Sequence, residues 1–240
     1  MDFWERFECE VKVRSCYSRG YSGAMELLKS QSASICWHKR IESNDIYFDT
    51  YNRLLLSREH VFRFKYKRKA GINYNYKFPL ETEEHVLVRR EFYGDVGFRG
   101  LDLGNHFHRK LPVLCHLWQL LSSQNEPGND YQTFEPRIAI EKKREGFLIC
   151  HDKWGQFAAV VVDRLCARSI IDGKTLSDAI CEFSELEIEL RPSSVSTHQI
   201  DYLNRIAESL QDLGYGLSLE SKYQFASRNL EPLNQSPSQE

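Results

Sequence analysis

The sequence Phe7-Glu8-Cys9-Glu10-Val11-Lys12 alternates apolar and charged residues, and it decides how the rest of the chain is interpreted. Successive side chains of an extended strand point to opposite faces of the sheet. The charged side chains therefore share one face, which Arg14 continues, and the apolar ones share the other face with Val13. A single strand of this kind in a half-exposed sheet would simply turn its charges to water.

The same alternation recurs in two later segments. Phe62–Lys67 has the sequence FRFKYK, and Glu185–Leu190 has the sequence ELEIEL. A barrel has an inner and an outer face on every strand, so several strands that each carry a charged and an apolar face predict a barrel with a charged interior.

The segment Glu8-Cys9-Glu10-Val11-Lys12 fits the ExExK signature of the CYTH, or triphosphate tunnel metalloenzyme, superfamily. Further motifs resemble those of the superfamily in the same order over residues 5–226. The resemblance implies an α+β fold, an eight-stranded antiparallel β-barrel tunnel with helices packed outside, which binds triphosphate together with a divalent metal. We expect one such domain over residues 1–228, followed by a disordered tail over 229–240, which is polar and rich in Pro and Ser.

The first half of the chain supplies the basic motifs. Arg63 and Lys65 match the paired basic positions of the superfamily, and Lys77 matches its TxK.P strand. Arg89 and Glu91 match the first two positions of RxExE. The third position is Tyr93. This departure removes one carboxylate from the interior and leaves open that Glu91 holds a lysine or arginine in place instead of a metal.

The second half supplies the remaining motifs. Lys142 and Arg144 resemble the inward pair of a KxR strand, although Ile138 and Ile140 have the same parity, so either a β-bulge intervenes or Lys143 faces inward. Asp163 takes the place of an acid near the tunnel. Glu185, Glu187 and Glu189 share one face, and the motif ExE needs only two of them. Lys222 lies in a segment that resembles the motif KSKY.

Several local elements can be predicted from periodicity and end signals. We expect a helix over Gly23–Ser30 with Ser22 as its cap, a strand end at Ile46–Thr50, and strands within Leu54–Lys69. Asp49 and Thr50 should shape the turn that follows them through side-chain-to-backbone bonds. Further elements are expected in the rest of the chain: a strand over Val86–Tyr93, a helix within Pro112–Leu121 and a helix over Ser194–Gly214 that Gly214 ends.

The resemblance also implies a role for each charged position. The expected catalytic residues are Lys12, Glu91 and Asp163. The expected phosphate ligands are Arg63, Lys65, Lys77, Arg89, Lys142, Arg144 and Lys222. The expected metal ligands are Glu8, Glu10, Glu185, Glu187 and Glu189, holding Mg²⁺ or Mn²⁺, since such hard cations bind carboxylate and phosphate oxygens together. His106 and His108 form an HxH pair that lacks a third metal ligand nearby in the sequence.

These expectations favour an enzyme, a metal-dependent triphosphatase that acts on inorganic tripolyphosphate or an organic triphosphate. Two alternatives stay open: an adenylyl cyclase of the same superfamily, and a non-catalytic module that binds polyphosphate or nucleotide. The 32 Lys and Arg nearly balance the 34 Asp and Glu, which disfavours bulk binding of nucleic acid. The partner is therefore expected to be a small-molecule triphosphate, with the protein a monomer or homodimer.

The cysteines and the hydropathy of the chain indicate its surroundings. Seven cysteines are scattered without a CxxC pair or zinc-type spacing, so we expect them to be reduced. No apolar run approaches the roughly 18 residues that a membrane span needs, and charged residues interrupt the N-terminal segment where a signal peptide would be apolar. The sequence therefore predicts a cytoplasmic protein without a membrane partner.

Overall fold

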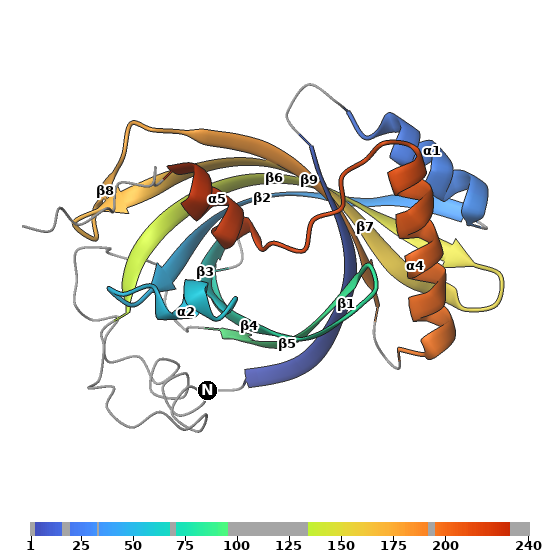
Figure 1. Ribbon diagram of the computed structural model, residues 1–240, viewed down its shortest axis with the longest axis horizontal. Helices are drawn as coiled ribbons and strands as arrows, with labels where there is room; N and C mark the ends of the chain where they lie inside the picture. Colours follow the sequence, from blue (N-terminus) through green and yellow to red (C-terminus); the bar gives the residue numbers. More distant parts are fainter. Residues whose placement is uncertain are drawn as a thin grey trace, which may run out of the picture.

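The computed structural model describes residues 3–15, 20–32, 34–67, 71–95, 134–191 and 195–230. Within these residues, eight long strands form a closed antiparallel barrel in the order β6-β2-β3-β4-β5-β1-β9-β7, which β7 closes by pairing with β6 (Figure 1). The strands are β1 (Phe3–Ser15), β2 (Ser34–Asp49), β3 (Val61–Lys67), β4 (Gly71–Glu83), β5 (Val86–Asp95), β6 (Glu135–His151), β7 (Gly155–Ile171) and β9 (Cys181–Leu190). The short strand β8 (Thr175–Leu176) pairs with the end of β7. The expected eight-stranded antiparallel barrel is confirmed.

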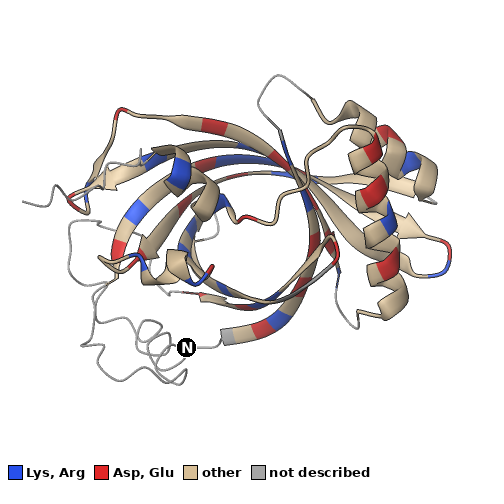
Figure 2. Ribbon diagram, in the orientation of Figure 1, with Lys and Arg blue, Asp and Glu red and all other residues tan. Residues whose placement is uncertain are grey.

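Two helices cover the outside of the barrel, as expected. α1 (Ser22–Gln31) and α4 (Thr197–Asp212) pack against each other, and α4 also contacts β1 and β5 (Figure 1). Val11 and Val13, from the apolar face of the first motif, are fully buried in the same cluster as Leu203 of α4. The alternation of the opening segment thus places its apolar side under the helices and its charged side in the barrel. Figure 2 marks the acidic and basic positions along β1.

The ends of the two outer helices differ in how well local signals predict them. The backbone N–H of Ser196 donates to Oε1 of Gln199, 3.0 Å away, at the start of α4, and Gly214 follows its end with a φ of 78°. The predicted C-terminal glycine is confirmed. Ser22, in contrast, is the first residue of α1 and not its cap: the residue before the helix is Tyr21, without a side-chain cap.

The predicted turn after β2 is confirmed, but it leads into a helix where a strand was expected. Oδ1 of Asp49 accepts hydrogen bonds from the N–H groups of Thr50 and Leu55, both at 2.8 Å. Its Oδ2 accepts from the N–H of Leu56 at 2.9 Å. These bonds occupy N–H groups that have no partner within a helix, so the segment forms the short helix α2 (Leu54–Ser57) before β3 begins.

The helix α5 (Lys222–Leu230) lies against the inner face of the barrel at one end (Figure 1). Tyr223 of α5 is buried among inward side chains that include Ile138 and Ile140 of β6. The barrel interior therefore has an apolar part under α5 and a charged part beyond it. This explains why Ile138, Ile140 and Lys142 share one face without a β-bulge between them, while Lys143 is exposed.

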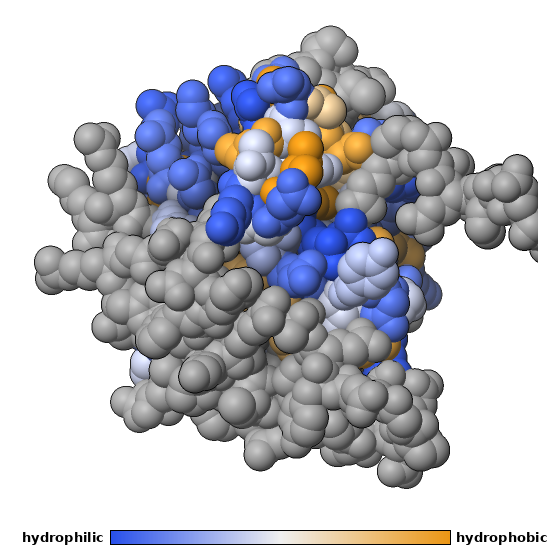
Figure 3. Space-filling model, turned by 90° about the vertical axis from the view of Figure 1, so that its left-hand side faces the viewer, coloured by the Kyte–Doolittle hydropathy of each residue, from blue (hydrophilic) through white to orange (hydrophobic). Residues whose placement is uncertain are grey.

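Some expectations lie outside the described residues: the helix within Pro112–Leu121, the pair His106 and His108, and residues 231–240 of the expected tail. Residues 229–230, which were also expected in the tail, belong to α5. Among the described residues, no helix is long and apolar enough to cross a membrane. Figure 3 shows the end of the molecule that carries α2 and β8, where hydrophobic residues gather in one patch beside hydrophilic ones. The described cysteines Cys9, Cys36, Cys150, Cys166 and Cys181 are all free thiols.

Candidate functional site

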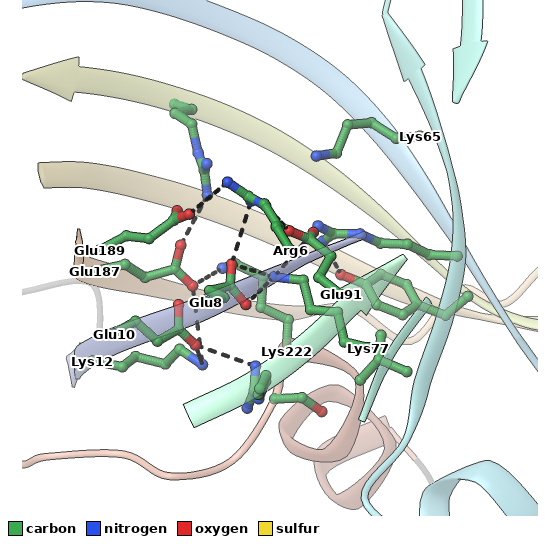
Figure 4. Close-up of a pocket in the computed structure, with 16 residues that line it drawn as sticks. Arg6, Glu8, Glu10, Lys12, Lys65, Lys77, Glu91, Glu187, Glu189 and Lys222 are labelled. Carbon is green, nitrogen blue, oxygen red and sulfur yellow. Dashed lines mark hydrogen bonds and ion pairs between the residues drawn. The ribbon is translucent and has the colours of Figure 1, made fainter. Parts of the chain in front are cut away.

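A charged cavity of ≈ 70 Å³ lies inside the barrel, next to the apolar part under α5 (Figure 4). Its charged lining consists of Arg6, Glu8, Glu10, Lys12, Arg63, Lys65, Lys77, Arg89, Glu91, Arg144, Glu187, Glu189 and Lys222. Eight of these side chains are Lys or Arg and five are Glu, so the lining carries an excess of three positive charges when all are ionised. We call this space the charged cavity.

Strand register explains how residues far apart in sequence meet there. β1 lies between β5 and β9, so that Glu8 stands opposite Arg89 and Lys12 stands opposite Glu187. Opposite charges at such cross-strand positions attract each other and stabilise the pairing. The pair formed by Glu10 and Glu189 is an exception, because two carboxylates face each other there.

Glutamates of the charged cavity are engaged by its cations. Nζ of Lys77 donates to both carboxylate oxygens of Glu8. Oε1 of Glu10 lies 3.1 Å from Nζ of Lys12 and 3.2 Å from Nη1 of Arg89. Glu8 and Glu10 therefore already have positive partners. Any anion that enters the cavity must compete with these glutamates for the cations.

Glu91 holds two of the cations of the charged cavity. Its Oε2 accepts a hydrogen bond from Nε of Arg6, its Oε1 accepts one from Asn75, and Nζ of Lys77 lies 3.6 Å from its Oε1. The nearby cations Lys77 and Arg6 keep the pKa of Glu91 well below its usual value, despite the opposing effect of burial. The geometry matches the alternative left open by the sequence, in which Glu91 holds basic side chains in place.

A deeper group of acids, Asp163 and Glu185, lies outside the lining of the charged cavity and is contacted by two cations of that lining, Arg144 and Lys222. Nε and Nη2 of Arg144 each lie 2.6 Å from an oxygen of Asp163, which is completely buried. Nζ of Lys222 lies 2.8 Å from Glu185 and 3.2 Å from Asp163. Of the three glutamates on β9, Glu187 and Glu189 thus face the cavity, and Glu185 belongs to the deeper group.

Lys142 also belongs to the deeper part of the barrel. Its Nζ lies 2.8 Å from Oδ2 of Asp45, which Nη1 of Arg63 contacts at 3.0 Å. Burial lowers the pKa of Lys142 to about 8, although Asp45 raises it. Lys142 therefore faces inward as expected but reaches the charged cavity only through Asp45 and Arg63.

Lys65 differs from the other cations that line the charged cavity. The structure gives its Nζ no ion pair or hydrogen bond within the described part of the chain, and Figure 4 shows it apart from the network of dashed contacts. Burial, followed by the charges of Arg63 and Lys142, lowers its pKa well below the usual value. An anion placed in the cavity would offset both effects, because it would supply the negative charge that Lys65 lacks.

The carboxylates of the charged cavity are buried and crowded enough to raise the pKa of one of them. Burial, followed by the charge of Glu8, raises the pKa of Glu189 to about 7, and Glu10 adds to the effect. These crowded oxygens have the donor chemistry that Mg²⁺ or Mn²⁺ prefers. Among the described residues no group of three or more His, Cys, Asp or Glu is placed to hold a metal ion, because cations lie between the carboxylates. These carboxylates thus have the chemistry that suits a hard cation. Such an ion would compete with the Lys and Arg side chains that pair with them.

Three residues of this region were missing from the sequence-based set. Arg6 lies 3.0 Å from Glu189 and lines the charged cavity, and its even parity with Glu8 was a usable signal. Asp45 holds Arg63 and Lys142, but the predicted strand began only at Ile46. Tyr47 accepts a hydrogen bond from Nη1 of Arg63 at 3.0 Å, a contact that no pattern indicated.

Comparison with known proteins supports the fold. No protein-family model and no curated protein sequence matches the chain. A putative adenylyl cyclase from Hippeastrum, described as having a dominant triphosphatase activity, is similar in structure with a TM-score of 0.52 and 17% identity, over 95% of this chain and 99% of that one. The PH1819 protein from Pyrococcus horikoshii has a TM-score of 0.50 and 15% identity, over 91% and 97% of the two chains.

These similarities extend over nearly the whole of each chain, and at this identity they establish the fold. The fold that the ordered motifs suggested is therefore confirmed: the chain has the same closed antiparallel barrel as these two proteins.

Proposed function

We propose that this chain, which has the triphosphate tunnel fold, binds a triphosphate in the charged cavity and hydrolyses it with the help of Mg²⁺ or Mn²⁺. One observation carries the proposal. An enclosed cavity with an excess of positive charge contains a cation, Lys65, that has no ion-pair partner in the described part of the chain. A polyanion would supply the missing negative charge.

The phosphate ligands in this proposal are the cations that reach the charged cavity: Arg63, Lys65, Lys77, Arg89, Arg144 and Lys222. The cavity of ≈ 70 Å³ has room for only a few water molecules. A triphosphate therefore enters as Lys and Arg side chains turn from glutamates to phosphate oxygens. Lys77 illustrates the exchange: its ammonium now donates to Glu8 and would turn from that carboxylate to a phosphate oxygen.

The buried acids position these cations. Asp163 fixes the guanidinium of Arg144 through two bonds of 2.6 Å, and Asp45 holds Arg63. Lys142 neutralises Asp45 and so supports Arg63 instead of touching the phosphate itself. Lys12, which lies 3.1 Å from Glu10 in the lining of the charged cavity, would contact the terminal phosphate.

Glu8, Glu10, Glu187 and Glu189 would hold the divalent ion, since all four face the charged cavity. When bound, the ion neutralises phosphate charge and lowers the pKa of a bound water. Hydrolysis of a phosphoric anhydride depends mainly on positioning and on stabilisation of oxygen charge in the transition state. The fixed cations of the barrel supply that stabilisation in an enclosed site, where each contributes more than it would in water.

The test is phosphate release from tripolyphosphate, and separately from ATP, with and without Mg²⁺ or Mn²⁺. The sharpest variant is Lys65→Met, because removing an unpaired cation leaves no carboxylate without its partner. The matched control is Lys143→Met, because Lys143 lies between Lys142 and Arg144 in the sequence but is exposed on the outer face of β6. We expect orthophosphate and pyrophosphate from tripolyphosphate, a large loss of turnover in Lys65→Met, and wild-type turnover in Lys143→Met.

The products distinguish the alternatives. Cyclic AMP and pyrophosphate from ATP would show an adenylyl cyclase. Tight binding of tripolyphosphate without turnover in either metal would show a binding module. Equal activity of Lys65→Met and the wild type would contradict the proposed site.

A further inference from the structure

A second cavity, of ≈ 410 Å³, adjoins the charged cavity at the end of the barrel where β1 begins. The two cavities share Arg6, Lys65 and Glu91 in their linings. The second one also has Trp4, Asn75 and Tyr93 in its wall, and we call it the aromatic vestibule. Its volume lies in the range of pockets that hold small organic ligands, about 300–1,000 Å³.

Two aromatic rings form one wall of the aromatic vestibule. Trp4 of β1 and Tyr93 of β5 are cross-strand partners whose ring centroids lie 5.7 Å apart at an interplanar angle of 27°. Both belong to the inward-facing positions of their strands, yet Trp4 is 51% exposed and Tyr93 37%. A cross-strand aromatic pair stabilises a sheet, but here the pair borders a cavity that continues into the charged one. The guanidinium of Arg6 lies over the Tyr93 ring, 5.7 Å from its centroid, so Trp4 is the more exposed ring of the two.

The lining of the aromatic vestibule also offers a hydrogen-bond acceptor on Asn75 of β4, the cross-strand neighbour of Tyr93. Asn75 is buried, and its Nδ2 donates to Glu91, which fixes the orientation of its amide. Its Oδ1 is buried and has no hydrogen-bond partner among the described residues. A buried acceptor without a partner is unusual in native structures, and a donor on a bound ligand would satisfy it.

We propose that the aromatic vestibule binds the planar aromatic ring of an organic triphosphate, such as a nucleobase with an amino group, while the triphosphate occupies the charged cavity. The ring would stack on Trp4 and Tyr93, and its donor would reach Oδ1 of Asn75. Arg6 and Lys65 lie at the junction, where the first phosphate would follow the organic group. This inference rests on the proposed function and narrows its substrate to triphosphates that carry such a ring.

The experiment compares two probes, ATP and tripolyphosphate, which differ in the ring. Their dissociation constants are measured by calorimetry in buffer with EDTA, so that no turnover occurs, for the wild type, Trp4→Ala and Tyr93→Ala. Stacking of a base on an aromatic side chain changes affinity by about 5- to 100-fold. We expect each variant to weaken ATP binding by an amount in this range relative to tripolyphosphate.

Two further variants keep the result interpretable. Trp37→Ala is the matched control, because Trp37 is 62% exposed on β2 and lines neither cavity, and it should bind both probes like the wild type. Trp4→Phe retains a ring, so it should bind ATP more weakly than the wild type but more tightly than Trp4→Ala. It also takes the place of Trp4→Ala if that variant does not fold. ATP should also quench the tryptophan fluorescence of the wild type more than that of Trp4→Phe.

The outcomes separate this inference from the proposed function. An unchanged ratio of ATP to tripolyphosphate affinity in both aromatic variants would overturn the inference alone. Binding of ATP that depends on Trp4, without hydrolysis of any triphosphate, would support the inference and overturn the hydrolase. If neither probe binds the wild type, both are wrong.

Discussion

Glu10 of β1 and Glu189 of β9 lie directly opposite each other, and both face the charged cavity. Like charges at such positions destabilise a sheet. Arg6 contacts Glu189 at 3.0 Å and Lys12 contacts Glu10 at 3.1 Å, but burial and the neighbouring carboxylates still make the charged form of Glu189 unfavourable. The fold therefore retains an acidic pair that costs stability, as sites that bind a cation commonly do.

Glu189→Gln should stabilise the protein when no divalent metal is present. The substitution keeps the shape of the side chain and removes one of the two opposed charges. We expect the free energy of unfolding at pH 8 with EDTA to rise by about 1–2 kcal/mol, measured by urea denaturation. Glu182→Gln, on the same strand but exposed, should stay within about 0.5 kcal/mol of the wild type. A loss of stability in Glu189→Gln would mean that its ion pair with Arg6 outweighs the repulsion.

Glu8→Gln should separate binding of phosphate from metal-dependent turnover. Glu8 holds Nζ of Lys77, so its neutralisation frees a cation and removes a charge that repels phosphate. We expect tripolyphosphate to bind as tightly as to the wild type, or more tightly, in EDTA, while turnover with Mg²⁺ or Mn²⁺ is lost. Calorimetry and phosphate release measure the two effects. Glu5→Gln, which alters an exposed carboxylate on the outer face of β1, is the control. Weaker metal-free binding in Glu8→Gln would contradict this account.

The fold was predictable from the sequence because inward-facing and outward-facing side chains alternate along each strand. Residues such as Val11 and Lys12 carried that signal, and the structure places them on the expected faces. The pattern could not show where the charged interior ends, since Ile140 and Lys142 have the same parity but meet different neighbours. That boundary depends on α5, which lies about 80 residues away in the sequence from β6.

Side-chain hydrogen bonds account for what the sequence did not indicate. Leu54–Ser57 forms a helix because the carboxylate of Asp49 accepts from its backbone N–H groups. Asp45 matters because Arg63 and Lys142, on two other strands, both reach it. The first contact joins residues only six or seven positions apart, so the sequence indicated its turn but not the helix. The second arises from strand pairing that only the closed barrel creates.

His60 should make stability depend on pH in the acid range. Burial, followed by the charge of Arg58, lowers the pKa of His60 to about 4 from 6.5, and its Nδ1 lies 2.8 Å from the hydroxyl of Tyr76. Between these values the unfolded chain binds more protons at this residue than the folded one, so stability falls as pH falls from about 6.5 to 4. Urea denaturation between pH 7 and 4.5 should show a loss that is about 1–2 kcal/mol smaller in His60→Gln than in the wild type. Equal losses in the two proteins would assign the pH dependence to other groups.

Asp163→Asn should show that this acid positions a cation instead of reacting with the substrate. Asp163 is completely buried, outside the lining of the charged cavity, and both its oxygens bind Arg144 while Lys222 lies 3.2 Å away. Removing one partner of a buried ion pair costs about 3–5 kcal/mol when the other charge has no substitute. Here Glu187 also contacts Arg144, at 2.9 Å, and limits the loss. We therefore expect a loss of about 2–3 kcal/mol of stability in urea denaturation.

The same variant should bind tripolyphosphate differently, which a purely structural role would not require. Without Asp163, the guanidinium of Arg144 is free to turn, so we expect a raised KM for tripolyphosphate with a smaller change in kcat, measured where the variant is fully folded. Asp152→Asn, in the exposed turn between β6 and β7, is the control. A loss of kcat with unchanged KM would instead place Asp163 at the reacting atoms, and unchanged kinetics in the folded variant would reduce its role to stability.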